Sequence, residues 1–113
     1  MIRVEARVDE DGLLVDFMAS GHSALGPIGS DIVCAAFSIL ARTAYSSFSK
    51  LPGALVKGEA KAPGSLDFAV KLVPVSVKER AIGITAFLVE GISGLAREFP
   101  AEIGWTMEHI RRI

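Results

Sequence analysis

Charged and apolar residues alternate over residues 2–9, and this period of two predicts a strand with one buried face. Residues 9–12 read Asp-Glu-Asp-Gly, which predicts a hairpin turn with Gly12 at a positive φ. Residues 13–20 alternate again and are expected to form the returning strand. This first part of the chain therefore predicts a β-hairpin.

Residues 21–29 contain three glycines and one proline, a composition typical of a loop. Ser30 or Asp31 is a suitable N-cap, and the apolar residues that follow fall at helical spacing to about Ser49. The sequence Leu-Pro-Gly at residues 51–53 is expected to end this helix. A buried helix is thus predicted directly after a flexible loop.

A second hairpin is predicted for residues 54–60 and 65–74, joined by the turn-forming residues 61–64. Alternate positions of its second strand are apolar and are expected to face the core. These positions are Leu66, Phe68, Val70 and Leu72.

A second helix is predicted to begin at Ser76, because Glu79 three residues later completes a capping box. It is expected to run to about Phe99, with Pro100 ending it. Residues 102–110 alternate again and predict a last strand. Small residues in the second helix suggest close packing against the first helix; they are Gly83, Gly91, Ser93 and Gly94.

The predicted fold class is α/β of the α+β type, with element order ββαββαβ. The sheet is expected to be mostly antiparallel, with two helices on one of its faces. No repeat or linker divides the chain, so residues 1–113 are expected to form a single domain.

Composition and charge narrow the classes of function. Half of the residues are apolar and 22% are charged, which is typical of an ordered globular protein. Twelve basic and 13 acidic residues leave no basic excess for phosphates, so direct nucleic-acid binding is not expected. A lone cysteine forms no internal disulfide, and this favours a cytoplasmic location. No signal peptide is apparent, and no uninterrupted apolar run reaches the ~18 residues of a membrane span, so no membrane association is expected.

The strongest chemical candidates are Cys34, the only cysteine, and His22, twelve residues before it. If Asp31 is the N-cap, Cys34 lies in the first helical turn, close to free N–H groups that favour a thiolate and can bind an oxyanion. His22 is then the candidate general base and acid. The alternatives remain open, because free cysteines are often buried in cores and a loop histidine is often only a surface residue.

Other residues of this segment are candidates for supporting roles. Asp31 and Ser38 share a helix face with Cys34; Asp31 can cap the helix or orient His22, and Ser38 can bond back to the carbonyl of Cys34 or polarise the site. Gly21 and Gly29 flank the loop and are possible hinges. One cysteine and two distant histidines do not make a ligand set, so neither a metal site nor a cofactor is expected.

Two stretches of this segment form a specific combination: Gly21-His22 and Gly29-Ser30-Asp31-Ile32-Val33-Cys34-Ala35-Ala36-Phe37-Ser38. Together they resemble a known family, the ribosomal-processing cysteine protease family Prp. Within them, Gly21, His22, Asp31, Cys34 and Ser38 match the family motif.

The resemblance implies a cytoplasmic, homodimeric cysteine endopeptidase that uses a dyad, here Cys34 and His22. Its implied partner is the N-terminal peptide of large-subunit ribosomal protein L27, an apolar extension that the enzyme removes. Two rival interpretations stay open. One is a non-catalytic ribosome-assembly module that binds an apolar ribosomal-protein tail, and the other is a dimeric structural protein in which Cys34 only fills space.

Overall fold

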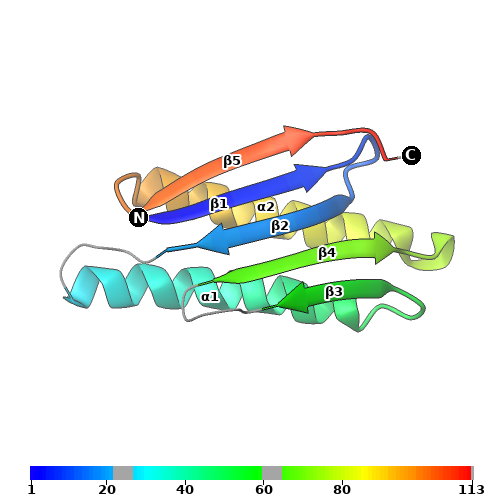
Figure 1. The fold of residues 1–113 in the computed structure, drawn as a ribbon, viewed down its shortest axis with the longest axis horizontal. Helices are drawn as coiled ribbons and strands as arrows, with labels where there is room; N and C mark the ends of the chain where they lie inside the picture. Colours follow the sequence, from blue (N-terminus) through cyan, green and yellow to red (C-terminus); the bar gives the residue numbers. More distant parts are fainter. Residues whose placement is uncertain (22–26, 60–64, 113) are drawn as a thin grey trace.

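The computed structural model describes residues 1–21, 27–59 and 65–112, with residues 27–31 described by their backbone only. Its elements follow the predicted order, with one short 3-10 turn in addition (Figure 1). They are β1 (Ile2–Val8), β2 (Leu14–Ser20), α1 (Pro27–Ser49), β3 (Leu55–Glu59), β4 (Leu66–Leu72), η1 (Val75–Val77), α2 (Lys78–Glu98) and β5 (Ile103–His109).

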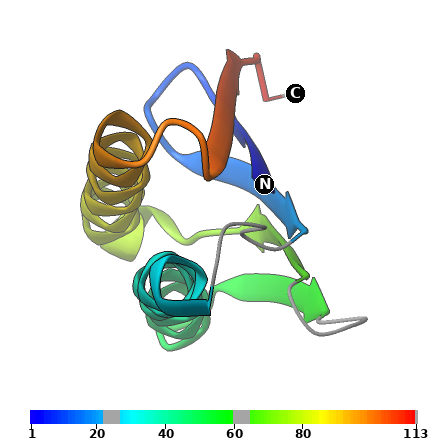
Figure 2. The ribbon, with the colours of Figure 1, turned by 90° about the vertical axis from the view of Figure 1, so that its left-hand side faces the viewer.

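The five strands form one sheet in the order β3-β4-β2-β1-β5. Three of the pairings are antiparallel, and the pairing of β1 with β5 is parallel. Figure 2 shows both helices on the same face of the sheet, which leaves the other face uncovered. The predicted fold class is confirmed, and the parallel pairing is the feature that makes the sheet mixed rather than purely antiparallel.

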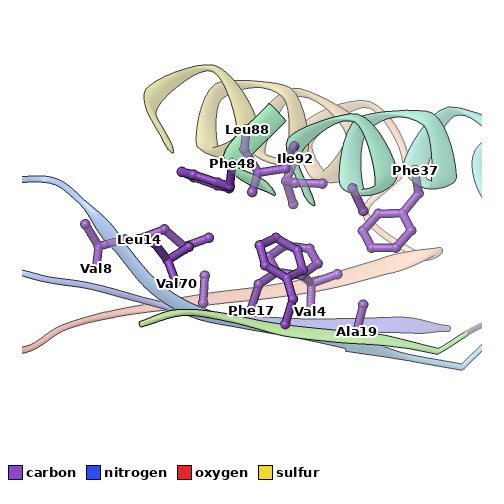
Figure 3. Packing of buried hydrophobic residues seen from close by; sticks show 14 of the residues in the cluster. Val4, Val8, Leu14, Phe17, Ala19, Phe37, Phe48, Val70, Leu88 and Ile92 are labelled. Atoms are coloured by element: carbon purple, nitrogen blue, oxygen red, sulfur yellow. The ribbon is translucent and has the colours of Figure 1, made fainter. Parts of the chain in front are cut away.

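Alternating burial along the central strands builds the core. The residues of β1 alternate between buried and exposed along its whole length, as the sequence pattern predicts. Phe17 of β2 stacks on Phe68 of β4 with ring centroids 5.2 Å apart, and Phe48 of α1 contacts the same cluster. Leu88 and Ile92 of α2 complete the layer above the sheet (Figure 3). Burial of each large apolar side chain stabilises the fold by roughly 1.5–3 kcal/mol.

The predicted start of the first helix is wrong. Helix α1 begins at Pro27, so residues 27–29, expected to be loop, are helical, and neither Ser30 nor Asp31 is the N-cap. Proline fits the first helical position because it has no N–H to leave unpaired there and its φ already suits a helix. Cys34 consequently lies about two turns into α1 rather than in its first turn.

The predicted start of the second helix is also displaced. Ser76 lies within η1, and α2 begins at Lys78 with Val77 as a cap that makes no side-chain hydrogen bond. The capping box is therefore absent, although Glu79 does lie in the first turn of α2, where a carboxylate is favourable. Leu72, expected to face the core, is 58% exposed.

Helix packing is as close as predicted at Gly91. A Cβ at Gly91 would lie only 2.8 Å from Cδ2 of Leu40, so the glycine is what lets α2 approach α1 here. At Gly83 a Cβ would meet open space, so close packing does not extend to that position.

The segment Ile32–Ser49 of α1 is long and apolar enough, by length and composition, to cross a membrane. Sequence inspection did not identify it, because Arg42 interrupts the apolar run. Core helices of soluble proteins pass the same test. Here the buried side chains of Val33, Phe37 and Phe48 lie in the core beneath α1, which accounts for the apolar composition of the segment.

Candidate active site

A cavity of about 430 Å³ lies between α1 and one end of the sheet. One stripe of α1 at helical spacing forms its first wall: Cys34, Phe37, Ser38, Ala41, Arg42 and Tyr45. The opposite wall comes from the ends of four strands and from residues next to them: Ile2, Gly21, Gly58, Glu59, Ser65 and Leu66. The cavity therefore joins the cysteine to segments that are distant in the sequence.

Cys34 is half-buried and lines this cavity, while it also packs against the edge of the hydrophobic core. Its neighbour Val33 is fully buried, so the register of α1 turns Val33 toward the core and Cys34 toward the cavity. The thiol thus faces a space large enough for part of a peptide.

The position of Cys34 within α1 changes the expected chemistry. The free N–H groups of a helix are those of its first four residues, here residues 27–30, and the last of them precedes Cys34 by four residues, or about 6 Å of helix rise. The prediction that Cys34 lies in the first turn, directly beside these N–H groups, is wrong.

Gly21 turns the chain at the end of β2, and its conformation requires a glycine. Its φ is +97°, and a Cβ there would collide with the backbone oxygen of Met1. Because Gly21 also lines the cavity, the chain leaves β2 at the edge of the space that Cys34 faces.

The other predicted site residues divide into two groups. His22 lies outside the described residues, and Gly29 and Asp31 are described only as part of the helical backbone of α1. Ser38 lines the cavity one turn after Cys34. Among the contacts of the described residues, the hydroxyl of Ser38 does not donate to the carbonyl of Cys34. Such a bond does form later in the same helix, where the hydroxyl of Ser49 donates to the carbonyl of Tyr45 at 2.8 Å.

Sequence reasoning missed Tyr45 and Gly58, which form the far end of the cavity. Two signals were present in the sequence. Tyr45 continues the three- and four-residue spacing that starts at Cys34. Gly58 interrupts a strand, which is typical of a position where another group approaches the backbone closely.

Three carboxylates outside the cavity lie close to one another: the ligand atoms of Asp9, Glu10 and Asp11 fall within 4.8 Å. Cations of the protein itself already contact this group. Arg112 donates to Asp9, and Lys78 donates to Asp11 at 2.7 Å. These contacts give the cluster a structural explanation.

The model of the cysteine protease Prp family matches residues 1–104 of the chain. The chain belongs to the cysteine protease Prp family. This match covers every described residue of the cavity and nearly the whole fold. The prediction that the protein is a cysteine protease is thereby confirmed.

Several solved structures share the fold of this chain. SMU.848 from Streptococcus mutans is 22% identical, with 97% of this chain and 96% of that chain covered and a TM-score of 0.79. The essential ribosomal processing protease Prp from S. aureus, in complex with a substrate peptide, is 19% identical, with coverage of 96% and 100% and a TM-score of 0.76. The same enzyme with a covalently linked product peptide gives 20% identity, the same coverage and a TM-score of 0.78. No curated protein matches the sequence of this chain.

Proposed function

We propose that the protein is a Prp-type endopeptidase that removes the N-terminal extension of ribosomal protein L27 with a Cys34–His22 dyad. The observation that carries this proposal is that Cys34 and Gly21 line the same cavity. His22 directly follows Gly21, so its backbone is bonded to a residue that lines the cavity.

In the proposed mechanism, Nε2 or Nδ1 of His22 accepts the proton from Sγ of Cys34. The thiolate attacks the scissile carbonyl carbon, and a C–S bond forms as the carbonyl oxygen takes up the negative charge. The intermediate then collapses, the C–N bond breaks, and His22 returns its proton to the leaving amine. Water, deprotonated by His22, hydrolyses the thioester and regenerates the thiol.

Ser38 is the described side chain best suited to stabilise the oxyanion. Its hydroxyl is on the same helical stripe as Cys34 and lines the same cavity. A hydrogen bond from such a donor is strongest in the transition state, where the oxygen carries its charge. We assign Ser38 this role in place of the N–H groups at the start of α1.

The proposed substrate rests on the family and on the shape of the cavity. The S. aureus relative is described as a ribosomal processing protease and was solved with a substrate peptide. In the present chain, Phe37, Ala41 and Leu66 give the cavity apolar walls. An apolar extension of a ribosomal protein fits such walls better than a charged segment does.

The direct test is to incubate the protein with L27 of the same organism and to weigh the products by mass spectrometry. Cys34→Ala and His22→Ala should each lower cleavage by at least ~10³-fold. His109→Ala is the matched control, because His109 is exposed on β5 and outside the cavity. Full activity in either dyad variant would refute the dyad, and an intact L27 after incubation with the wild type would refute the substrate.

The alternative of a non-catalytic binding module makes a different prediction. Such a module would bind the extension equally well as wild type and as Cys34→Ser, and neither protein would release a product. Membership of a protease family favours the enzyme. Alkylation by iodoacetamide distinguishes the two at once, because an activated Cys34 should react at pH 6.5 much faster than free glutathione does.

We also propose that the protein is a cytoplasmic homodimer, as the family resemblance implies. The outer face of the two helices carries exposed apolar side chains, with Ile39 69% and Phe87 73% exposed. A second copy packed against this face would bury them. Light scattering after size-exclusion chromatography should give the mass of a dimer, and Phe87→Glu should shift the protein toward the monomer.

A further inference from the structure

One wall of the cavity beside Cys34 is a long stripe of α1. It runs three turns from Cys34 to Tyr45, on the order of 16 Å at 1.5 Å per residue. An extended peptide rises about 3.3 Å per residue, so about five of its residues would span this length. We call the cavity the groove, because this wall is long enough for an extended peptide.

Tyr45 forms the far end of this groove by lying over Gly58. A Cβ at Gly58 would be 2.7 Å from Cζ and 3.0 Å from the hydroxyl oxygen of Tyr45, so only glycine leaves room for the ring. Gly58 pairs with Phe68 in the sheet, and the rings of Tyr45 and Phe68 have centroids 5.3 Å apart. The ring of Tyr45 therefore packs against the side chain of Phe68 and the backbone of Gly58.

Tyr45 and Leu66 give the groove apolar surface beside its charged rim. Leu66 lines it from the first position of β4, and Tyr45 offers an aromatic ring. The described charged residues of the groove are Arg42 and Glu59, and both side chains are exposed to solvent. A large apolar side chain at this end would be desolvated against rings that favour aromatic or aliphatic contacts.

We propose that Tyr45, held in place by Gly58, is a specificity-determining residue that selects a large apolar side chain remote from the scissile bond. An extended peptide rises about 3.3 Å per residue, so the selected side chain lies about five residues from the bond that Cys34 attacks. This inference rests on the proposed function, because it requires that a peptide occupy the groove with its scissile bond at Cys34.

The test begins with the L27 peptide that the wild type cleaves. After the cut has been located, each residue up to eight positions away is replaced by alanine in turn. For the wild type, the alanine replacement about five residues from the cut should lower kcat/KM by at least ~10-fold. This is the lower end of the difference in kcat/KM that an apolar pocket produces between a large and a truncated side chain. Tyr45→Ala and Gly58→Ala should each reduce that difference to less than ~3-fold.

Two further variants separate the roles of the two residues. Tyr45→Phe keeps the ring and should retain the preference. If Gly58 acts only by positioning Tyr45, the double variant Tyr45→Ala/Gly58→Ala should behave like Tyr45→Ala alone, whereas independent effects would add. Gly104→Ala is the matched control for a glycine substitution within a strand, because Gly104 lies on β5 and does not line the groove.

Two results would overturn the inference. One is a Gly58→Ala variant that melts at the wild-type temperature and lowers kcat/KM equally for all peptides; the other is an unchanged preference in Tyr45→Ala. If the wild type cleaves no peptide, the proposed function fails instead. In that case the dissociation constants of the alanine-substituted and the unsubstituted peptides are compared instead. Equal affinity of the wild type for both peptides would still refute the remote subsite.

Discussion

The guanidinium of Arg112 holds the carboxylate of Asp9, with Nε donating to Oδ2 at 3.0 Å. The other carboxylate oxygen accepts the backbone N–H groups of Asp11 and Leu13, so Asp9 closes the β1–β2 turn at only 4% exposure. The two terminal nitrogens of Arg112 donate to the carbonyl oxygens of Val70 and Leu14. One arginine thereby ties the first turn to two strands of the sheet.

This arrangement predicts a dependence of stability on acid. Burial raises the pKa of Asp9, but the hydrogen bonds from the Leu13 N–H, from Arg112 and from the Asp11 N–H outweigh burial and leave the pKa below its usual value. Because the folded-state pKa is lowered, Asp9 stabilises the fold above pH ~4 and loses this contribution as the pH falls through its folded pKa. Urea unfolding at intervals from pH 7 to pH 2 should show the loss.

Arg112→Ala should reveal how much of the stability contributed by ionised Asp9 depends on the guanidinium of Arg112. The variant should lower the free energy of unfolding at pH 7 by about 2 kcal/mol, as expected for a lost hydrogen bond to a charged group. It should also flatten the decline between pH 4 and pH 2, because the pKa of Asp9 moves back up. An unaltered acid limb of the stability curve would show that Arg112 contributes only packing.

A second prediction concerns Thr85, a buried polar residue of α2. Its hydroxyl accepts the backbone N–H of Leu14 at 3.0 Å and donates to the carbonyl of Ala81 at 2.9 Å. Thr85→Val keeps the shape but removes the acceptor, and it should cost about 1–3 kcal/mol in urea unfolding. Thr85→Ser, which keeps the hydroxyl, should cost clearly less, and equal losses in the two variants would contradict the hydrogen-bond explanation.

A third prediction follows from the conformation of Gly21. Gly21→Ala should destabilise the protein by about 1–3 kcal/mol, because the positive φ and the approach of the Met1 carbonyl both oppose a side chain. Cleavage should fall as well, since the residue after it is the proposed base. Gly104→Ala is the matched control, because a Cβ there would meet the movable sulfur of Met1 at 3.2 Å. Thermal melting and peptide cleavage measure both effects.

The fourth prediction tests the proposed oxyanion donor. Ser38→Ala should lower kcat by ~10²-fold or more with little change in KM, because the hydrogen bond forms fully only in the transition state. Ser46→Ala, on the same helix but lining neither this cavity nor the hollow beside Ile39 and Phe87, should keep wild-type kinetics. A loss that appears only in KM would instead assign Ser38 to substrate binding.

The strands and helices were predictable where the local pattern agrees with the final packing. The alternation in residues 2–9 matches the burial of β1, and Gly12 adopts the positive φ expected of the hairpin turn. The helix starts were less predictable, because Pro27 and η1 compete with the polar residues Asp31 and Ser76 that look like caps. Local capping signals cannot show which of two nearby starts packs better on the sheet.

The site was predictable only in part, for a related reason. The sequence singled out Cys34 and Ser38 because their chemistry is local to one helix. The groove, however, is made by the approach of Gly58 to Tyr45, and that approach depends on the pairing of β3 with β4 and on the packing of α1 over both. The helical spacing indicates Tyr45 and the glycine within a strand indicates Gly58, but neither signal shows that these two residues meet.

Strand β1 is translated first, yet its neighbour β5 is the last of the five strands to be made. Until residue 103 and its successors leave the exit tunnel, one flank of β1 has no partner, and such an open flank is a hazard for aggregation. Ile2 at the start of this strand also lines the groove, so the strand whose flank stays open until β5 is made is itself part of the groove wall.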